Sequence, residues 1–326
     1  MKRISKVLLV LMLVFSLVAC TSPSKPDDGG KEGKDKDEKI KVALMVGFLG
    51  DLSFNDSANE GIERAKKDLN IDAKVIEYGD DPNQIEPTLV DTADAGYDIV
   101  IGPSQFGDYM EEYAADYPDT TFILFDASVD YENHDVENVY SIIYSANEAS
   151  FAAGYLAAKK SETGVIGFLG GEEAPVINDF LVGYIEGAKH ANPDIKVAAS
   201  FVGNWTDSAK GKELSLAMNN QKADVLFGAA GGATMGIFEA ALEKDMLAIG
   251  VDFDQAMVFK NEGKEDFAKI TVSSVMKNVG DSLYRALDLY QKGELKVGAE
   301  EVLGIKENGV GLADNEYYQA LVDEDL

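Results

Sequence analysis

Short apolar runs alternate along the chain with segments whose apolar residues recur at helical spacing. In the first half, the runs that predict buried strands lie at residues 42–46, 75–76, 97–101 and 121–125. Helices are predicted for residues 57–69 and 88–95, because their apolar positions share one helical face. Strands that alternate with helices in this way indicate a parallel sheet covered by helices on both faces.

The same order of elements occurs a second time. An apolar run at 165–169 enters a Gly-containing loop and then a helix, as the run at 42–46 does. Further along, 97–102 is echoed by 223–228, and 122–126 by 247–252. Because three echoes occur in the same order, the pattern predicts two similar α/β lobes, and two lobes that face each other enclose a cleft.

The last third of the chain does not extend this repeat. It predicts a strand at 269–275, an amphipathic helix at 279–290 and a β-hairpin at 303–311. We therefore expect a chain that crosses between the lobes several times. The predicted N-terminal lobe comprises residues 39–145 plus about 276–305, and the C-terminal lobe residues 146–275 plus about 306–326.

The first residues have the order of a secretory signal. Three basic residues precede an apolar run at 7–19, which is shorter than the roughly 20 residues that span a membrane. The run ends in Leu17-Val18-Ala19-Cys20, which resembles a lipobox, and Cys20 is the only cysteine. We predict a signal peptide at 1–19 and a lipid on Cys20; a buried free thiol in a helix is the alternative.

The segment that follows Cys20 is rich in Ser, Pro, Gly, Lys and Asp. Residues 20–38 contain no large apolar side chain, so they cannot bury enough surface to offset the entropy of ordering. We interpret them as a tether between the lipid and the folded part. No later stretch is long and apolar enough to span a bilayer, so the expected location is the extracytoplasmic face of the cell membrane, reached through a lipid anchor.

The charge of the chain is strongly acidic. It has 58 acidic and 29 basic residues, a net charge of −29 at pH 7. A solvated exterior accounts for most of this excess. Such a surface repels polyanions, so nucleic acids and free nucleotides are disfavoured as partners.

Ligands of open parallel sheets bind beyond the carboxyl ends of the strands. After the first strand, the segment GFLGDLSFND offers Asp51, Ser53, Phe54 and Asn55 at a helix N-terminus. The structural alternative is an ordinary N-cap by Asn55 or Asp56. That alternative requires no aromatic residue, so we favour a pocket here.

Two aspartates end equivalent strands of the two halves. Asp126 and Asp252 could each accept charge-assisted hydrogen bonds from a diol; a solvated loop residue or a helix cap is the alternative. Lys277 follows another strand end, although most lysines are simply solvated. The matching positions of the two aspartates favour a role in binding.

Two further segments are candidates for close contact with a ligand. The turn at 228–236, which includes Gly231 and Gly232, lacks Walker and dinucleotide fingerprints, so it suits backbone approach to a neutral ligand or tight packing. Trp205, the only tryptophan, follows a strand and could either stack on a planar ligand or pack between lobes.

Patterns of catalytic residues are missing from the sequence. His134 and His190 lie in polar surroundings, no His, Cys and Asp cluster has metal-ligand spacing, and there is no Gly-x-Ser-x-Gly elbow. The sequence therefore predicts a binding protein and not an enzyme, with no cofactor and no metal.

Several segments together resemble the basic membrane protein family. They are GDLSFNDSANEGIERA, the strand-end Asp126, GNWTDSAKGKE, GAAGGATMG, GVDFDQ and SSVMKN, within residues 39–315. The chain is similar to the family's purine nucleoside receptor lipoproteins, the substrate-binding components of ABC-type nucleoside importers. The resemblance implies a type I periplasmic-binding-protein fold, with two doubly wound parallel-sheet lobes, a nucleoside between them and a permease as partner.

The resemblance also implies roles for individual residues. Phe54 matches the position that stacks on the base, with Asn55 as a polar contact beside it, and Asp126 matches a carboxylate that reaches the base edge. Asp252 and Lys277 match the ribose-binding pair.

The turn at 231–232 matches the approach to the sugar. Two other positions depart from the family's usual residue. Trp205 stands where the family often has Phe. Gly50 stands where many members have an Asp, directly before Asp51.

Other functions fit the same sequence pattern. A sensor or adhesin of this fold would not feed a transporter, and loss of nucleoside uptake on deletion would separate it from an importer component. Nucleoside hydrolysis would require a Ca²⁺-binding Asp cluster or a placed acid, and would release free base. A binding protein of the same kind with a sugar or an autoinducer as its ligand is a further alternative.

Overall fold

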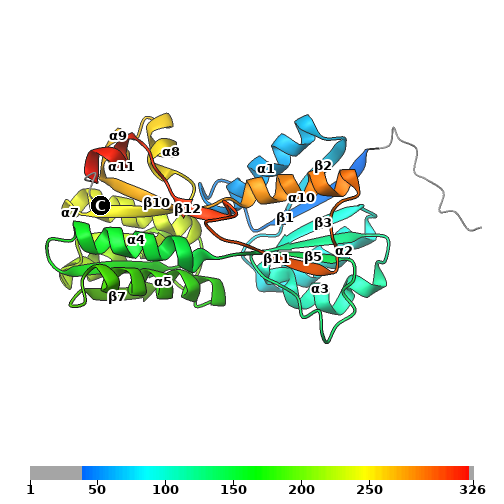
Figure 1. Cartoon of the computed structure of the whole chain (residues 1–326), viewed down its shortest axis with the longest axis horizontal. Helices are drawn as coiled ribbons and strands as arrows, with labels where there is room; N and C mark the ends of the chain where they lie inside the picture. Colours follow the sequence, from blue (N-terminus) through cyan, green and yellow to red (C-terminus); the bar gives the residue numbers. More distant parts are fainter. Residues whose placement is uncertain (1–38, 323–326) are drawn as a thin grey trace, which may run out of the picture. The chain divides into compact units, whose positions relative to one another are not determined.

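The computed structural model of the protein describes residues 39–322 (Figure 1). The predicted signal peptide, the predicted lipidation site Cys20 and the predicted tether lie outside these residues. The described chain folds around two six-stranded sheets, each of which belongs to one lobe. The prediction of two parallel-sheet α/β lobes is confirmed.

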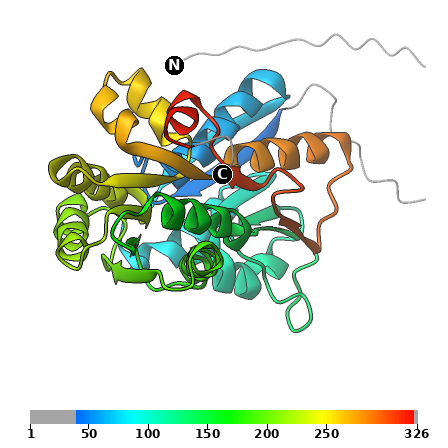
Figure 2. The same ribbon diagram turned by 60° about the vertical axis from the view of Figure 1, so that its left-hand side comes forward.

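The sheet of the first lobe is parallel throughout, in the order β11-β5-β4-β3-β1-β2. Its strands are β1 (Ile40–Val46), β2 (Ile71–Glu77), β3 (Ile99–Pro103), β4 (Thr121–Phe125), β5 (Val139–Tyr144) and β11 (Ala299–Leu303). Its helices are α1 (Phe54–Asp68), α2 (Ile85–Asp94), α3 (Gly107–Tyr113) and α10 (Val279–Lys292). Helix α10 packs beside α1 in both views, although more than 200 residues separate them in sequence (Figures 1 and 2).

The sheet of the second lobe has the order β12-β10-β9-β8-β6-β7. Its strands are β6 (Val165–Gly170), β7 (Lys196–Phe201), β8 (Val225–Ala229), β9 (Leu247–Asp252), β10 (Thr271–Lys277) and β12 (Val310–Leu312). Only β12 is antiparallel to its neighbour, β10. The helices are α4 (Ala146–Lys160), α5 (Pro175–Ala191), α6 (Ser208–Asn220), α7 (Met235–Lys244), α8 (Gln255–Asn261), α9 (Glu265–Ile270) and α11 (Glu316–Leu321).

Alternate residues of each buried strand enter different hydrophobic cores. In β1, Leu44 joins the core that includes α1 and α10, whereas the next residue, Met45, joins the core that includes α2 and α3. In β8, Phe227 packs with α4 and α5, and Leu226 with α6 and α7. Because successive side chains of a strand point to opposite faces, an unbroken apolar run is what a sheet covered on both faces requires.

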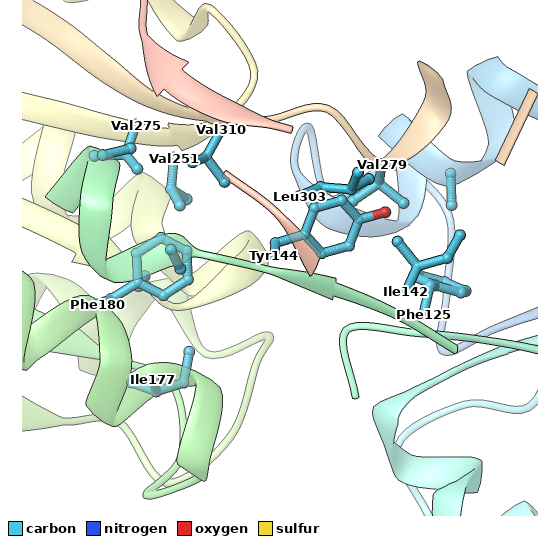
Figure 3. Packing of buried hydrophobic residues seen from close by; sticks show 14 of the residues in the cluster. Phe125, Ile142, Tyr144, Ile177, Phe180, Val251, Val275, Val279, Leu303 and Val310 are labelled. Carbon is cyan, nitrogen blue, oxygen red and sulfur yellow. The ribbon is translucent and has the colours of Figure 1, made fainter. Parts of the chain in front are cut away.

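The chain crosses between the lobes three times. The crossings join β5 to α4, β10 to α10 and β11 to β12, and they run through Ser145, Asn278 and residues 304–309. Figure 3 shows the packing around them, with Tyr144 and Val279 on the side of the first lobe and Val251 and Val275 on the side of the second. The hydrophobic core at the crossings is continuous between the two lobes.

The predicted hairpin at 303–311 is wrong. Strand β11 pairs with β5 in the first sheet, and β12 pairs with β10 in the second. The local turn does form, because the amide of Gly309 donates to the carbonyl of Gly304 and Asn308 has a left-handed φ of 58°. The two strands then part because each completes the edge of a different sheet.

Two predicted boundaries also move. The strand predicted to begin at Lys269 begins at Thr271, because Lys269 and Ile270 form the last turn of α9. The helix predicted from residue 57 begins at Phe54, which brings its first turn to the strand ends where a ligand would lie.

Candidate ligand-binding site

A cavity of about 560 Å³ opens between the strand ends of the two sheets. Its volume is typical of pockets for small organic ligands. Of the predicted site residues, those that line the cavity are Asp51, Phe54, Asn55, Asp126, Trp205, Gly231, Asp252 and Lys277. Ser53 and Gly232 are not among the lining residues.

The loop that precedes α1 has a constrained backbone. Gly50 and Leu52 adopt left-handed φ angles of 88° and 50°, which is unusual for a leucine. The Asp51 carboxylate accepts from the backbone amides of Ser53, Asn55 and Asp56 at 2.9–3.1 Å, and from the side-chain amide of Asn55 at 2.9 Å. Asp51 therefore caps the helix, a task that the sequence had assigned, as an alternative, to Asn55 or Asp56.

Capping and burial shift the pKa of the Asp51 carboxyl in opposite directions. Burial raises the pKa of its carboxyl, and the backbone hydrogen bonds oppose part of that rise. With its oxygens engaged by the start of α1, Asp51 holds Phe54 and Asn55 at the cavity wall.

Asp126 and Asp252 have the same unusual backbone geometry at equivalent strand ends. Asp126 directly follows β4 with φ 70°, and Asp252 ends β9 with φ 65°. Aspartate tolerates this left-handed region better than most residues do. Both carboxylates are buried and face the cavity.

Lys277 is buried in an ion pair that joins the two lobes. Its Nζ lies 2.7 Å from each carboxylate oxygen of Asp126, and the two side chains are 3% and 7% exposed. The rings of Phe54, Phe180 and Tyr144 surround the same ammonium at 5.1–5.5 Å from their centroids. The structure therefore contradicts the alternative of a solvated lysine.

The partner of Lys277 in the structure is Asp126, whereas the family resemblance pairs this lysine with Asp252. Burial raises the pKa of Asp126, and the adjacent ammonium opposes part of the rise. The side chain of Asp252 instead accepts from the Ser53 hydroxyl, a second contact between lobes. Burial raises the pKa of Asp252 to about 6, although Lys277 and Ser53 lower it.

A third contact between the lobes lies beside Ser53. The side-chain amide of Gln255, on α8, donates to the carbonyl of Leu52 at 3.3 Å. The α1 loop is thus held by the second lobe through two consecutive residues. No role was predicted for Gln255, although it ends the segment GVDFDQ, because a polar residue in the first turn of a helix is ordinary.

Aromatic side chains line the cavity from both lobes. Phe54 packs on Phe125 with ring centroids 5.2 Å apart, and Trp205 is half-buried on the other lobe. Phe180 and Tyr78 also line the cavity, although neither was predicted. A flat, largely apolar ligand with a polar edge fits such a lining.

Within residues 39–322, no group of three or more His, Cys, Asp or Glu side chains is placed to hold a metal ion. In the same part of the chain, no helix has the length and apolar character needed to cross a membrane.

Two α/β lobes joined by three crossings, with a polar and aromatic cavity between their strand ends, define a two-lobed solute-binding protein of the type I periplasmic-binding fold. Residues 39–326 match the family described as ABC transporter substrate-binding protein, PnrA-like. The chain belongs to this family. Its members are substrate-binding proteins of ABC transporters, which act outside the cytoplasm and are not enzymes.

Relatives over most of the chain agree with this assignment. Basic membrane protein D of Borreliella burgdorferi is 33% identical, over 96% of this chain and 87% of the relative. The ABC transporter nucleoside-binding protein BmpA of Lactococcus lactis is 31% identical, over 93% and 89%. An ABC transporter solute-binding protein of Aeropyrum pernix superposes with a TM-score of 0.77 at 27% identity, over 84% of this chain and 76% of that one.

Proposed function

We propose that this protein binds a purine nucleoside between its lobes and delivers it to the permease of an ABC importer. The observation that carries the proposal is the ring of Phe54 beside the buried charges of Asp126 and Lys277, with Asp252 on the same cavity. A purine nucleoside presents flat apolar faces, a polar base edge and a diol, which matches these three kinds of group. The Lactococcus lactis relative, named as nucleoside-binding, supports the same ligand class.

The base would lie among residues of both lobes. In this proposal Phe54 stacks on one face of the purine, Trp205 forms the opposite aromatic wall, and Asn55 and Asp126 contact the polar edge. Each of these four residues lines the cavity.

The sugar would lie against the second carboxylate. Asp252 accepts hydrogen bonds from the ribose hydroxyls, and the turn at 231–232 approaches the ring. Lys277 uses two donors on Asp126, so a third hydrogen of its ammonium remains for a ribose oxygen.

The charge of the lining disfavours phosphorylated ligands. It contains six carboxylates and one ammonium, and the carboxylates are Asp51, Asp80, Asp81, Asp126, Glu172 and Asp252. A phosphate would have to be desolvated beside them with a single lysine to balance it. Nucleosides should therefore be preferred to nucleotides.

A thermal-shift panel tests the ligand class. At about 100 times its dissociation constant, a ligand that binds only the native state adds about 2.7 kcal/mol to the free energy of unfolding. Guanosine, inosine or adenosine should raise the melting temperature by several degrees, while ribose, free bases and nucleoside monophosphates should change it little. A shift with ribose and with no nucleoside would reject the assignment.

The membrane attachment of the protein is proposed to run through a lipid on Cys20. The full-length protein expressed in a bacterium should enter the detergent phase and incorporate labelled fatty acid, because a diacylated cysteine adds apolar chain to an acidic globule. Cys20→Ser should abolish the labelling, whereas Ser22→Ala should keep it. A full-length wild-type protein that stays in the medium with a free thiol would contradict the proposal.

A further inference from the structure

The indole of Trp205 packs directly on the backbone of Gly171, the first residue after β6. A Cβ atom placed on Gly171 would lie 2.4 Å from Cε3 and 2.5 Å from Cζ3 of this indole. Non-bonded carbon atoms in proteins lie about 3.5–4.0 Å apart, so even an alanine at this position would displace the ring. Gly171 is buried and does not line the cavity, whereas Trp205 does.

Hydrogen bonds hold the backbone around Trp205, so a shift of the backbone to relieve such a clash would break them. The amide of Gly203 donates to the carbonyl of Gly171 at 2.8 Å, which ties the Trp205 loop to β6. The Trp205 carbonyl accepts from the amide of Ala233 at 3.1 Å. A Cβ on Gly231, whose φ is 55°, would lie 3.2 Å from that same carbonyl oxygen.

The loop is held from within as well. The side-chain oxygen of Asn204 accepts from the amides of Thr206 and Asp207 at 3.0 and 2.8 Å. With the backbone fixed at Gly203, Asn204 and Ala233, the ring is the part that can move. Because Gly171 lies behind it, the free direction is toward the cavity.

We infer that Gly171 is a positioning residue that sets how far the Trp205 indole projects into the cavity, and so sets the space left for the base of the ligand. The inference rests on the proposed function, in which Trp205 stacks on the base. A glycine here leaves the most space, which favours the two fused rings of a purine over the single ring of a pyrimidine. Any side chain at 171 displaces the indole, reduces this space and shifts selectivity toward smaller bases.

Gly171→Ala tests this inference, with Gly311→Ala as the matched control. A Cβ on Gly311 would meet no atom within 4 Å, and its φ is not left-handed. We expect Gly171→Ala to weaken purine nucleoside binding by about 10- to 200-fold, the range for one misplaced methylene in a pocket, and to weaken pyrimidine nucleosides less. Gly311→Ala should leave both affinities unchanged.

A double variant shows whether Gly171 acts through the indole. In a Trp205→Ala background, Gly171→Ala should change neither the melting temperature nor the remaining nucleoside affinity, because the clashing ring is gone. The double variant also supplies folded protein if Gly171→Ala alone is unstable. An equal loss of affinity in both backgrounds would overturn the inference.

Fluorescence separates this inference from the proposed function. Trp205 is the only tryptophan, so the emission of ligand-free Gly171→Ala reports the position of this one ring. We expect a shifted emission maximum relative to wild type and Gly311→Ala. If the wild type binds no nucleoside, the proposed function fails, yet a shifted maximum still supports the positioning role. An unchanged maximum with unchanged purine affinity rejects it.

Discussion

Lys277→Met should lower the free energy of unfolding of the ligand-free protein by about 3–5 kcal/mol at pH 7, the cost of removing one partner of a buried ion pair. The Lys277 side chain is 3% exposed, and its ammonium donates to both oxygens of Asp126. Without it, the Asp126 carboxylate is left in a low-dielectric site among aromatic rings. Denaturant unfolding measures this loss, with Lys306→Met, whose side chain is 94% exposed, as a control of little expected effect.

The loss should depend on pH in a defined direction. Burial already raises the pKa of Asp126, and removal of Lys277 raises it further because the opposing charge is gone. A carboxyl whose folded-state pKa exceeds its unfolded value lowers the free energy of unfolding most at high pH, where it is ionised. It lowers this free energy least at low pH, where it is protonated in both states. The destabilisation should therefore be smaller at pH 5 than at pH 8.

A double variant that combines Lys277→Met with Asp126→Asn should recover much of the stability that Lys277→Met alone loses. Asparagine tolerates the left-handed backbone conformation of this position. Its side chain is uncharged, so no unpaired charge is left buried. Lys277→Met with a loss of stability below 1 kcal/mol, or a double variant as unstable as the single one, would show that the ion pair contributes little.

Asp252→Asn is expected to weaken nucleoside binding by about 10- to 150-fold, which corresponds to about 1.5–3 kcal/mol for a charge-assisted hydrogen bond. The amide oxygen can still accept from Ser53, so the contact between lobes persists in the variant. Isothermal titration with guanosine or inosine measures the change. Asp254→Asn is the contrasting control, because Asp254 caps α8 and lies outside the cavity lining.

The affinity of the wild type should fall as the pH falls below about 6. Burial raises the pKa of Asp252 to about 6, and hydroxyl donors bind the ionised form. Protonation therefore competes with the ligand by up to tenfold per pH unit. The Asn variant should not show this dependence.

The stability of the ligand-free protein should have the opposite pH dependence and rise as the pH falls. Since the folded-state pKa of Asp252 lies above its unfolded value near 3.8, its ionised form destabilises the native state, fully above pH 6 and not at all below about pH 4. Asp252→Asn should then be no less stable than wild type at pH 7. Lower stability with near-normal affinity would identify Asp252 as a structural cap.

Much of the fold could be predicted because buried parallel strands are local signals. The runs at 42–46 and 122–125 are apolar without a break, and the structure packs both faces of each. The prediction of a hairpin at 303–311 failed for a physical reason as well. The turn of Asn308 and Gly309 has the same local chemistry whether the two flanking strands pair with each other or join different sheets.

The cavity itself could be predicted only in part. The rule that ligands bind at strand ends located Asp126 and Asp252, because strand ends can be read from the sequence. Phe180 could not be found this way, since it lies on α5 with Ile177 and Tyr184 at the spacing of an ordinary core face. The ion pair of Lys277 joins residues 151 positions apart, which no single sequence encodes locally.

The two strand-end aspartates share one backbone geometry, but their neighbours make them chemically different. A cavity with two equivalent carboxylates would accept an asymmetric molecule in either of two orientations, at equal cost. Here Asp126 is balanced by the Lys277 ammonium, whereas Asp252 receives the Ser53 hydroxyl. The duplicated fold thus supplies two similar ends, and one lysine at a lobe crossing gives the cavity a polarity. The same ligand turned end for end would meet a different charge at each end, so a single binding orientation is favoured.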